Sequence, residues 1–205
     1  MSRKNPELNK IGKTEIRKEK IRAVLAKRQP SLTVVAENIT DPHNLSAMLR
    51  SCDAVGILEV CLVYDGKQPF PKLGEKSSAS AKKWVNIRKF LSITECYKSL
   101  RTEGKKVYST HLGKESISLF DLDLTQPVAL VFGNEHTGLS EEATELADAN
   151  FIIPQTGMIQ SLNISVACAV SLYEAFRQRQ KAGMYDNSQL TEQQFLAYFD
   201  HFLKK

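Results

Sequence analysis

The stretch PVALVFGNEHTGLSEE, residues 127–142, gives the strongest strand prediction in the chain. PVALVFG (127–133) is an apolar run, which predicts a buried strand. A glycine-containing turn follows, and a helix is expected from about Ser140, with Glu141 and Glu142 favourably placed at its positive end. A buried strand that leads through a turn into a helix is the repeating unit of a parallel α/β sheet.

The same alternation of strands and helices continues on both sides of this unit. Apolar runs predict further strands at 32–38, 58–64, 84–90, 106–112 and 150–154. Helical spacing and capping signals predict helices at 14–28, 44–55, 92–103, 161–180 and 192–203. The predicted fold class is therefore α/β, a mostly parallel sheet flanked by helices on both faces, with ligands expected at the carboxyl ends of the strands. The polar stretch 65–83 predicts a surface loop.

Length and composition indicate one globular domain with terminal additions. The chain has 205 residues, 42% apolar and 25% charged, as is typical of a soluble protein. No apolar run reaches the length of a membrane span, and the charged N-terminus lacks the apolar segment of a secretory signal. We therefore expect a cytoplasmic protein with no membrane partner. The cysteines and histidines are scattered, so no metal site is expected.

The positive charge is concentrated at the N-terminus. Residues 1–28 hold ten Lys or Arg and three Glu, a net of +7, whereas the remaining chain has a net of −2. A basic arm attracts polyanions, and nucleic acid is the commonest polyanion in cytoplasm. A solvated helix that only keeps the protein soluble explains the composition equally well.

Two phosphate-binding motifs are nearly matched by VFGNEHTGLSEE (131–142). Gly133 and Gly138 have the spacing of the P-loop, but Leu139 occupies the lysine position, which argues against an NTPase. The dinucleotide fingerprint fails because Glu135 replaces the middle glycine, and a carboxylate there would repel a pyrophosphate. The turn therefore suits a ligand that is not multiply anionic. The alternative is a tight strand–helix connection with an exposed Glu.

Two further loops carry polar residues at predicted helix starts. In TDPHNLSAMLR (40–50), Asn44 would be a good N-cap, and Arg50 lies on the flank of the buried face, where a surface arginine is the default explanation.

The polar residues in the stretch IPQTGMIQSLNISVACA (153–169) could either cap a helix or bind a ligand. Gly157 suggests a sharp turn, and the small residues after it let another backbone approach closely. A packed helix capped by Ser161 explains most of this stretch, but it does not explain Asn163 in the first turn.

The three loops, in this order, resemble the SpoU/TrmH family of RNA ribose 2′-O-methyltransferases in the SPOUT superfamily. The likeness rests on N-x-x-A-x-x-R from Asn44 to Arg50, G-x-E-x-x-G from Gly133 to Gly138, and IPQTGMIQSLNISVA at 153–167. It covers nearly the whole chain and is closest to the tRNA guanosine-18 branch, which LTVVAENITDPHNLSAMLRSCDAVG and AFRQRQKAGMY also resemble.

The resemblance implies a fold, a cofactor and site residues. The C-terminal part of the parallel sheet would form a deep trefoil knot whose loops hold S-adenosylmethionine, and the protein would be a homodimer whose active sites use both subunits. The residues implied to bind the cofactor are Thr110, Gly133, Ile153, Met158 and Leu162. The residues implied to act on the ribose are Arg50, Asn44, Glu135, Ser161 and Asn163.

Arg50 would be the catalytic residue, acting on a ribose 2′-hydroxyl that must lose its proton as the methyl group arrives. A guanidinium stays protonated at neutral pH, so it is a poor base. The alternative is that Arg50 orients the hydroxyl and the adjacent phosphate and stabilises developing negative charge.

The resulting hypothesis is a methyltransferase that modifies a D-loop guanosine, guanosine 18, of tRNA, with tRNA rather than DNA as its partner. We expect a basic extension at 1–30, the methyltransferase domain at 31–182 and an amphipathic C-terminal helix at 183–205. No separate N-terminal RNA-binding domain is visible, which favours tRNA over ribosomal RNA. Methylation of a ribosomal RNA guanosine, or an RNA-binding module without activity, are the alternatives, and Glu135 argues against a dehydrogenase.

Overall fold

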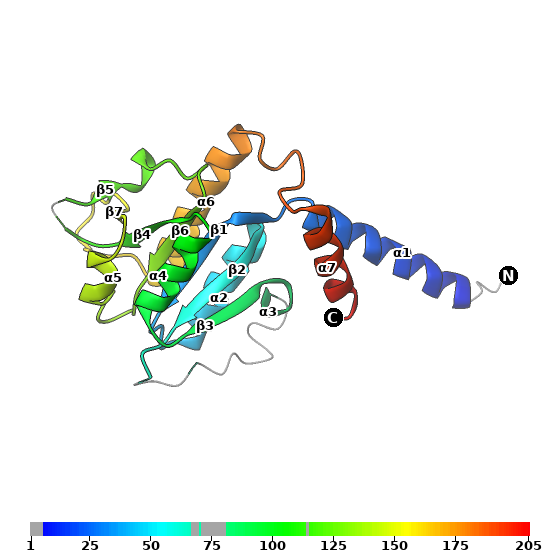
Figure 1. Ribbon diagram of the computed structural model, residues 1–205, viewed down its shortest axis with the longest axis horizontal. Coiled ribbons are helices and arrows are strands. Elements are labelled where there is room, and N and C mark those ends of the chain that lie inside the picture. The colour runs from blue at the N-terminus through cyan, green and yellow to red at the C-terminus, as the bar shows by residue number, and fades with distance from the viewer. Residues whose placement is uncertain (1–5, 67–69, 71–80, 114) are drawn as a thin grey trace.

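The computed structural model describes residues 6–66, 70, 81–113 and 115–205, and it has the predicted α/β architecture (Figure 1). The elements in order are α1 (Pro6–Leu25), β1 (Gln29–Glu37), α2 (Pro42–Ala54), β2 (Ile57–Val63), α3 (Ala81–Trp84), β3 (Asn86–Phe90), α4 (Ile93–Thr102), β4 (Lys106–Thr110), β5 (Ile117–Ser118), η1 (Leu119–Asp121), β6 (Val128–Phe132), α5 (Glu141–Glu145), β7 (Ala149–Ile152), α6 (Ile164–Lys181) and α7 (Glu192–Leu203). Most of the loop predicted at 65–83 lies outside the described residues.

All seven strands pair in parallel, in the order β3-β2-β1-β6-β4-β7-β5. The chain runs outward from β1 to β2 and β3 on one side, and it builds the other side from β6, β4 and β7. The order therefore reverses between β1 and β6, and in open α/β sheets such a switch point is where the loops at the carboxyl ends leave a crevice. The trefoil knot is a property of the whole chain path, which this strand order does not test, so the knot stays a prediction.

The central strand β1 is buried on both faces because its side chains alternate between two cores. Val34 and Ala36 belong to the larger core, which α2 and α6 cover, whereas Val35 belongs to the core beneath α4 and α5. This two-sided burial explains why the strand reads as a continuous apolar run rather than as an alternating pattern.

Helices α1 and α7 form a pair at one end of the molecule (Figure 1). Ile21 and Leu25 of α1 pack in one small core with Phe202 of α7, and Trp84 lies against the same core. Ile21 and Leu25 thus form the apolar face of α1 that meets the C-terminal helix. The first and last helices are brought together although they are far apart in the sequence.

Three local predictions need correction. The helix expected at 44–55 begins at Pro42, and its N-cap is Asp41 rather than Asn44, since the Asp41 side chain accepts from the His43 N–H at 2.8 Å. The helix expected from Ser161 begins at Ile164, and its N-cap is Asn163, whose side chain accepts from the Ser165 N–H at 2.9 Å. Asn163 satisfies the helix start better than a residue two positions earlier, since N-cap side chains reach only the first turn. The edge strand β5 was not predicted, because a two-residue strand carries no periodicity.

Arg179 joins several segments by hydrogen bonds at the end of the sheet that lies opposite the strand carboxyl ends. Its fully buried guanidinium donates to the carbonyls of Leu124 (2.8 Å) and Gln126 (2.9 Å), to the Gln29 side chain (3.1 Å) and to the Ser31 hydroxyl (2.9 Å). Burial lowers the pKa of Arg179 to about 10, so the group remains a cation at neutral pH. It joins α6 to β1 and to the segment that enters β6.

We therefore expect Arg179→Leu to lower the free energy of unfolding by at least about 3 kcal/mol, because several buried acceptors lose their donor together. Arg177→Leu is the matched control, since Arg177 is largely exposed and pairs only with Glu174, and it should cost less than about 1 kcal/mol. Urea unfolding of both variants measures the difference. Equal losses for the two variants would contradict this role of Arg179.

Candidate functional site

Loops that follow four neighbouring strands line a cavity of about 610 Å³ at the switch point. Asn44 lies just after β1, Glu135 after β6, Thr110 at the end of β4, and Ile153 after β7. A cavity of this volume is within the range that holds small-molecule ligands and cofactors.

The cavity brings together eight of the ten site residues that the resemblance implied. These are Asn44, Thr110, Gly133, Glu135, Ile153, Ser161, Leu162 and Asn163. Polar groups and apolar side chains both line it, so it can bind a ligand that has both kinds of surface.

The carboxylate of Glu135 is the centre of the polar side of the cavity. It accepts hydrogen bonds from the N–H (3.2 Å) and hydroxyl (3.1 Å) of Thr40, from the N–H of Asp41 (3.2 Å) and from the side-chain amide of Asn44 (3.0 Å). Thr40 and Asp41 lie directly before α2. Glu135 therefore ties the turn after β6 to the start of α2, where exposed backbone N–H groups favour an anion.

These hydrogen bonds keep Glu135 charged. Partial burial alone would raise the pKa of this carboxyl, but the bonds from Asn44 and from the backbone N–H groups of Thr40 and Asp41 favour the anion. The net effect lowers the pKa below its usual 4.5. The cavity thus carries a fixed negative charge at neutral pH, which suits a ligand with positive charge or hydrogen-bond donors and disfavours a pyrophosphate.

Asn44 and Asn163 extend the network to the start of α6. The amide of Asn44 donates to Glu135, and its side-chain oxygen accepts from the amide of Asn163 at 3.0 Å. The oxygen of Asn163 accepts in turn from the N–H (2.9 Å) and hydroxyl (2.6 Å) of Ser165. Because each amide uses its donor on one side and its acceptor on the other, the orientation of all three side chains is fixed.

The turn between β6 and α5 is closed tightly around Gly133. The backbones of Asn134 and Gly138 exchange two hydrogen bonds, at 2.9 and 3.0 Å. A Cβ on Gly133 would lie 2.4 Å from the carbonyl carbon of Gly138 and from the nitrogen of Leu139. Glycine is therefore required at 133 by the close approach of two backbone segments.

The close backbone approach expected around Gly157 is not present within the chain. The chain bends there, but a Cβ on Gly157 would meet no atom within 4 Å.

Two site residues that the resemblance implied lie apart from the cavity. Arg50 is exposed on α2, and Met158 is fully exposed in the loop before α6, and neither side chain lines the cavity.

Sequence reasoning missed two residues that shape the cavity. Asn134 fixes the turn after β6, since its amide donates to the Asn38 carbonyl at 2.7 Å and its oxygen accepts from the N–H of His136 (2.8 Å). Glu37 lies at the end of β1 and is only 4% exposed. The available signal for Glu37 was a carboxylate at the end of an otherwise apolar strand.

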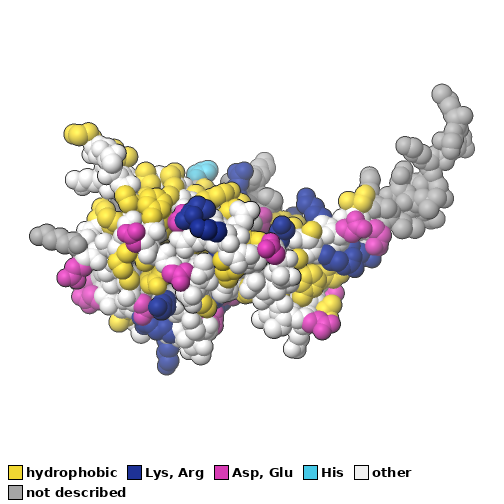
Figure 2. Space-filling model, turned by 90° about the horizontal axis from the view of Figure 1, so that it is seen from above, with side chains coloured by type: hydrophobic (Ala, Val, Ile, Leu, Met, Phe, Trp, Pro, Cys, Tyr) yellow, Lys and Arg dark blue, Asp and Glu magenta, His cyan; other side chains and the backbone are white. Residues whose placement is uncertain are grey.

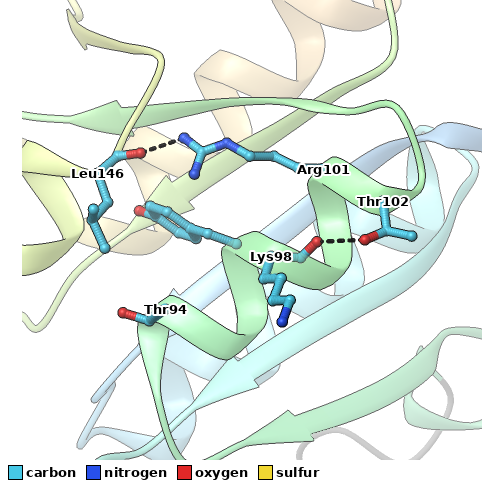
Figure 3. A pocket seen from close by; sticks show the side chains of 6 residues that line it. Thr94, Lys98, Arg101, Thr102 and Leu146 are labelled. Atoms are coloured by element: carbon cyan, nitrogen blue, oxygen red, sulfur yellow. Dashed lines mark hydrogen bonds between the residues drawn. The ribbon is translucent and has the colours of Figure 1, made fainter.

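A second hollow lies on α4, on the face of the sheet opposite α2 and α6 (Figure 3). Its lining residues are Thr94, Tyr97, Lys98, Arg101, Thr102 and Leu146. The guanidinium of Arg101 is already engaged, because it donates to the Leu146 carbonyl and to Asp148. No site residue implied by the resemblance lines this hollow, so the cavity at the switch point is the candidate functional site.

In the part of the chain that the structure describes, no group of three or more His, Cys, Asp and Glu side chains is arranged to hold a metal ion. Over the same residues, no helix combines the length and the apolar character needed to cross a membrane.

A parallel sheet with a polar cavity at its switch point defines an α/β protein that binds a ligand at the strand carboxyl ends. Residues 31–173 match the SpoU rRNA Methylase family, and the chain belongs to this family. The matched region contains all four loops that line the cavity.

Similar proteins support the same assignment over nearly the full chain. The chain is 45% identical over 193 residues to a tRNA (guanosine(18)-2′-O)-methyltransferase of Thermus thermophilus, covering 94% of this chain and 98% of that protein. A crystal structure of an Aquifex aeolicus TrmH/SpoU tRNA modifying enzyme superposes with a TM-score of 0.87 at 38% identity, covering 93% of this chain and 96% of that one. An AdoMet-bound rRNA methyltransferase from Sinorhizobium meliloti gives a TM-score of 0.65 at 29% identity, covering 77% and 59%.

The contact at Gly133 gives a direct test of the site's construction. Gly133→Ala should lower the free energy of unfolding by about 2 kcal/mol or more, because the added methyl group collides with backbone rather than with a flexible side chain. Gly157→Ala is the control, and it should leave stability unchanged or raise it by up to about 1 kcal/mol. Urea denaturation compares the two variants, and a tolerated Gly133→Ala would refute the assigned geometry.

Proposed function

We propose that the protein transfers the methyl group of S-adenosylmethionine to the ribose 2′-hydroxyl of guanosine 18 in the D-loop of tRNA. The observation that carries the proposal is the convergence of Asn44, Glu135 and Asn163 in one cavity of a chain that matches a tRNA guanosine-18 methyltransferase almost from end to end. The chain is 45% identical to that tRNA enzyme and 29% identical to the S. meliloti rRNA enzyme, which favours tRNA over ribosomal RNA.

The cavity fits S-adenosylmethionine in size and charge. Thr110, Gly133, Ile153 and Leu162 line it and would surround the cofactor, with Met158 moving in from the exposed loop before α6. Because Gly133 has no side chain, the backbone of Gly138 and Leu139 can close against it and complete this wall of the cavity. When bound, the cofactor supplies an electrophilic methyl group, and the anionic Glu135 suits its positive sulfonium.

The polar residues of the cavity orient the ribose. Asn44 and Asn163 are held in fixed orientations and can hold the sugar beside the cofactor site, together with Ser161. The proton of the 2′-hydroxyl would pass to solvent water during transfer, and the positive charge of Arg50 would stabilise the negative charge that develops on the oxygen. Orientation and electrostatics, rather than proton abstraction, are the roles that suit a guanidinium.

Arg50 can fill this role if the protein is a homodimer in which each subunit completes the other's site. The side chain is exposed and does not line the cavity of its own subunit. Helix α6 packs on α2, which carries Arg50, and presents exposed Val166 (47%) and Tyr173 (55%), while Phe120 on the adjacent η1 is 55% exposed. Figure 2 shows hydrophobic side chains gathered over part of one face. Exposed apolar surface of this kind is typical of a protein–protein interface.

The basic N-terminal region would hold the tRNA backbone in the cytoplasm. Arg17, Lys20 and Arg22 are exposed on α1, and α7 supports that helix through their shared core. Such contacts neutralise phosphates without reading sequence, so they add affinity but not the choice of nucleotide. We assign this positioning role to residues 1–30 together with 183–205, and the chemistry to 31–182.

The substrate assignment is tested with purified protein, labelled S-adenosylmethionine and a tRNA transcript. We expect one methyl group per transcript, on the ribose of guanosine 18. A matched transcript with 2′-deoxyguanosine at that position should accept none, because it lacks the hydroxyl. Methylation of the deoxy transcript, or of a base, would contradict the proposal.

The shared site is tested with two inactive variants. Arg50→Ala and Asn163→Ala should each lower the rate of methyl transfer at least about 100-fold, and Arg50→Ala should keep its cofactor affinity. Mixed dimers purified through two different tags should recover roughly half of the wild-type rate, because one of their two sites has an intact cavity and an intact Arg50. Mixed dimers without activity would show that Arg50 acts within its own subunit.

A further inference from the structure

Glu37 is a buried carboxylate to which the proposed mechanism gives no role. It ends β1, the strand beside the switch point, and is 4% exposed. Its two oxygens accept from one residue, since Ser140 donates its N–H at 2.9 Å and its hydroxyl at 2.7 Å. Within the described residues, no lysine or arginine forms an ion pair with it. Burying a charge without a cation costs free energy, because the charge loses its hydration. The two hydrogen bonds from Ser140 therefore provide most of the stabilisation of the buried Glu37 carboxylate.

Ser140 is the point where the turn after β6 ends and α5 begins. Its hydroxyl donates to Glu37 and accepts from the N–H of Ala143 at 3.1 Å, so its orientation is determined on both sides. The two preceding residues, Gly138 and Leu139, line the cavity. The position of Ser140 therefore sets the position of the cavity wall.

The turn is held at its other end by separate contacts. Asn134 donates to the carbonyl of Asn38, which adopts a left-handed conformation with φ of 51°. Glu135 binds the backbone before α2. The start of the turn is thus held by the segment after β1, through Asn38. The end of the turn is held by β1 itself, through Glu37.

We propose that Glu37 is a positioning residue for cofactor binding, which acts through Ser140 on the wall formed by Gly138 and Leu139. This inference rests on the proposed function. A carboxylate is required because two donors meet two acceptor oxygens; a glutamine would turn its NH2 group toward one of the donors. Glu135 and Asn44 hold the ribose side through different contacts, so the loss of Glu37 should weaken cofactor binding more than tRNA binding.

The test is Glu37→Gln in the full-length protein, with the dissociation constant for S-adenosylmethionine measured by calorimetry. We expect it to rise by about tenfold, the change typical of losing one charge-assisted hydrogen bond, while the KM for tRNA stays within about twofold of wild type. Ser140→Ala should raise the same constant. The double variant should bind no more weakly than the weaker single variant, because both substitutions break one contact.

Glu59→Gln is the matched control. Glu59 lies on β2 and is also a partly buried strand carboxylate, but its partner is Arg88, at 2.7 Å, on the edge strand β3. This variant should bind S-adenosylmethionine as wild type does.

The outcomes separate the inference from the proposed function. Wild-type protein that binds no S-adenosylmethionine would overturn the proposed function and this inference with it. If wild type binds and Glu37→Gln binds equally well, only the inference fails. An equal loss of affinity in Glu59→Gln would also overturn it, because the effect would then be a general consequence of disturbing the sheet.

Discussion

The hydrogen bonds between the Glu135 carboxylate and the start of α2 are the constraint on which the rest of the site depends. They join the loop after β6 to the loop after β1, the two strands between which the sheet order reverses. Asn44, fixed by Glu135, in turn fixes Asn163 at the start of α6. This set of hydrogen bonds therefore determines where three separate parts of the sequence meet, and removing the charge would release all of them.

The same carboxylate explains why this site disfavours a pyrophosphate. In dinucleotide-binding sheets the turn at the switch point presents glycine and backbone N–H groups to a pyrophosphate. Here those N–H groups, at Thr40 and Asp41, are occupied by Glu135. The N–H groups that could bind an anion are therefore not free, and the site itself carries a negative charge. A negative charge suits a sulfonium cofactor and the hydroxyl groups of a ribose.

Most of the fold could be predicted because burial on both faces leaves a clear sequence signal. The runs at 32–38 and 127–133 became β1 and β6, and the helix predicted at 192–203 has those bounds. The functional site was harder to predict from the sequence. Sequence identified Glu135 as the residue that excludes a pyrophosphate, but not that it binds the backbone 95 positions away at Thr40. Ser161 was expected to cap α6 and Asn163 does so, since capping depends on where the loop ends rather than on residue type.

The central claim is that this cavity serves one ribose in tRNA. The most direct measurement is mass spectrometry of tRNA from cells that lack the protein, compared with cells in which it is restored. The account predicts that 2′-O-methylguanosine at position 18 disappears and returns with the wild-type protein, while other ribose methylations persist. Retention of that nucleotide in tRNA, or loss of a methyl group only from ribosomal RNA, would contradict it.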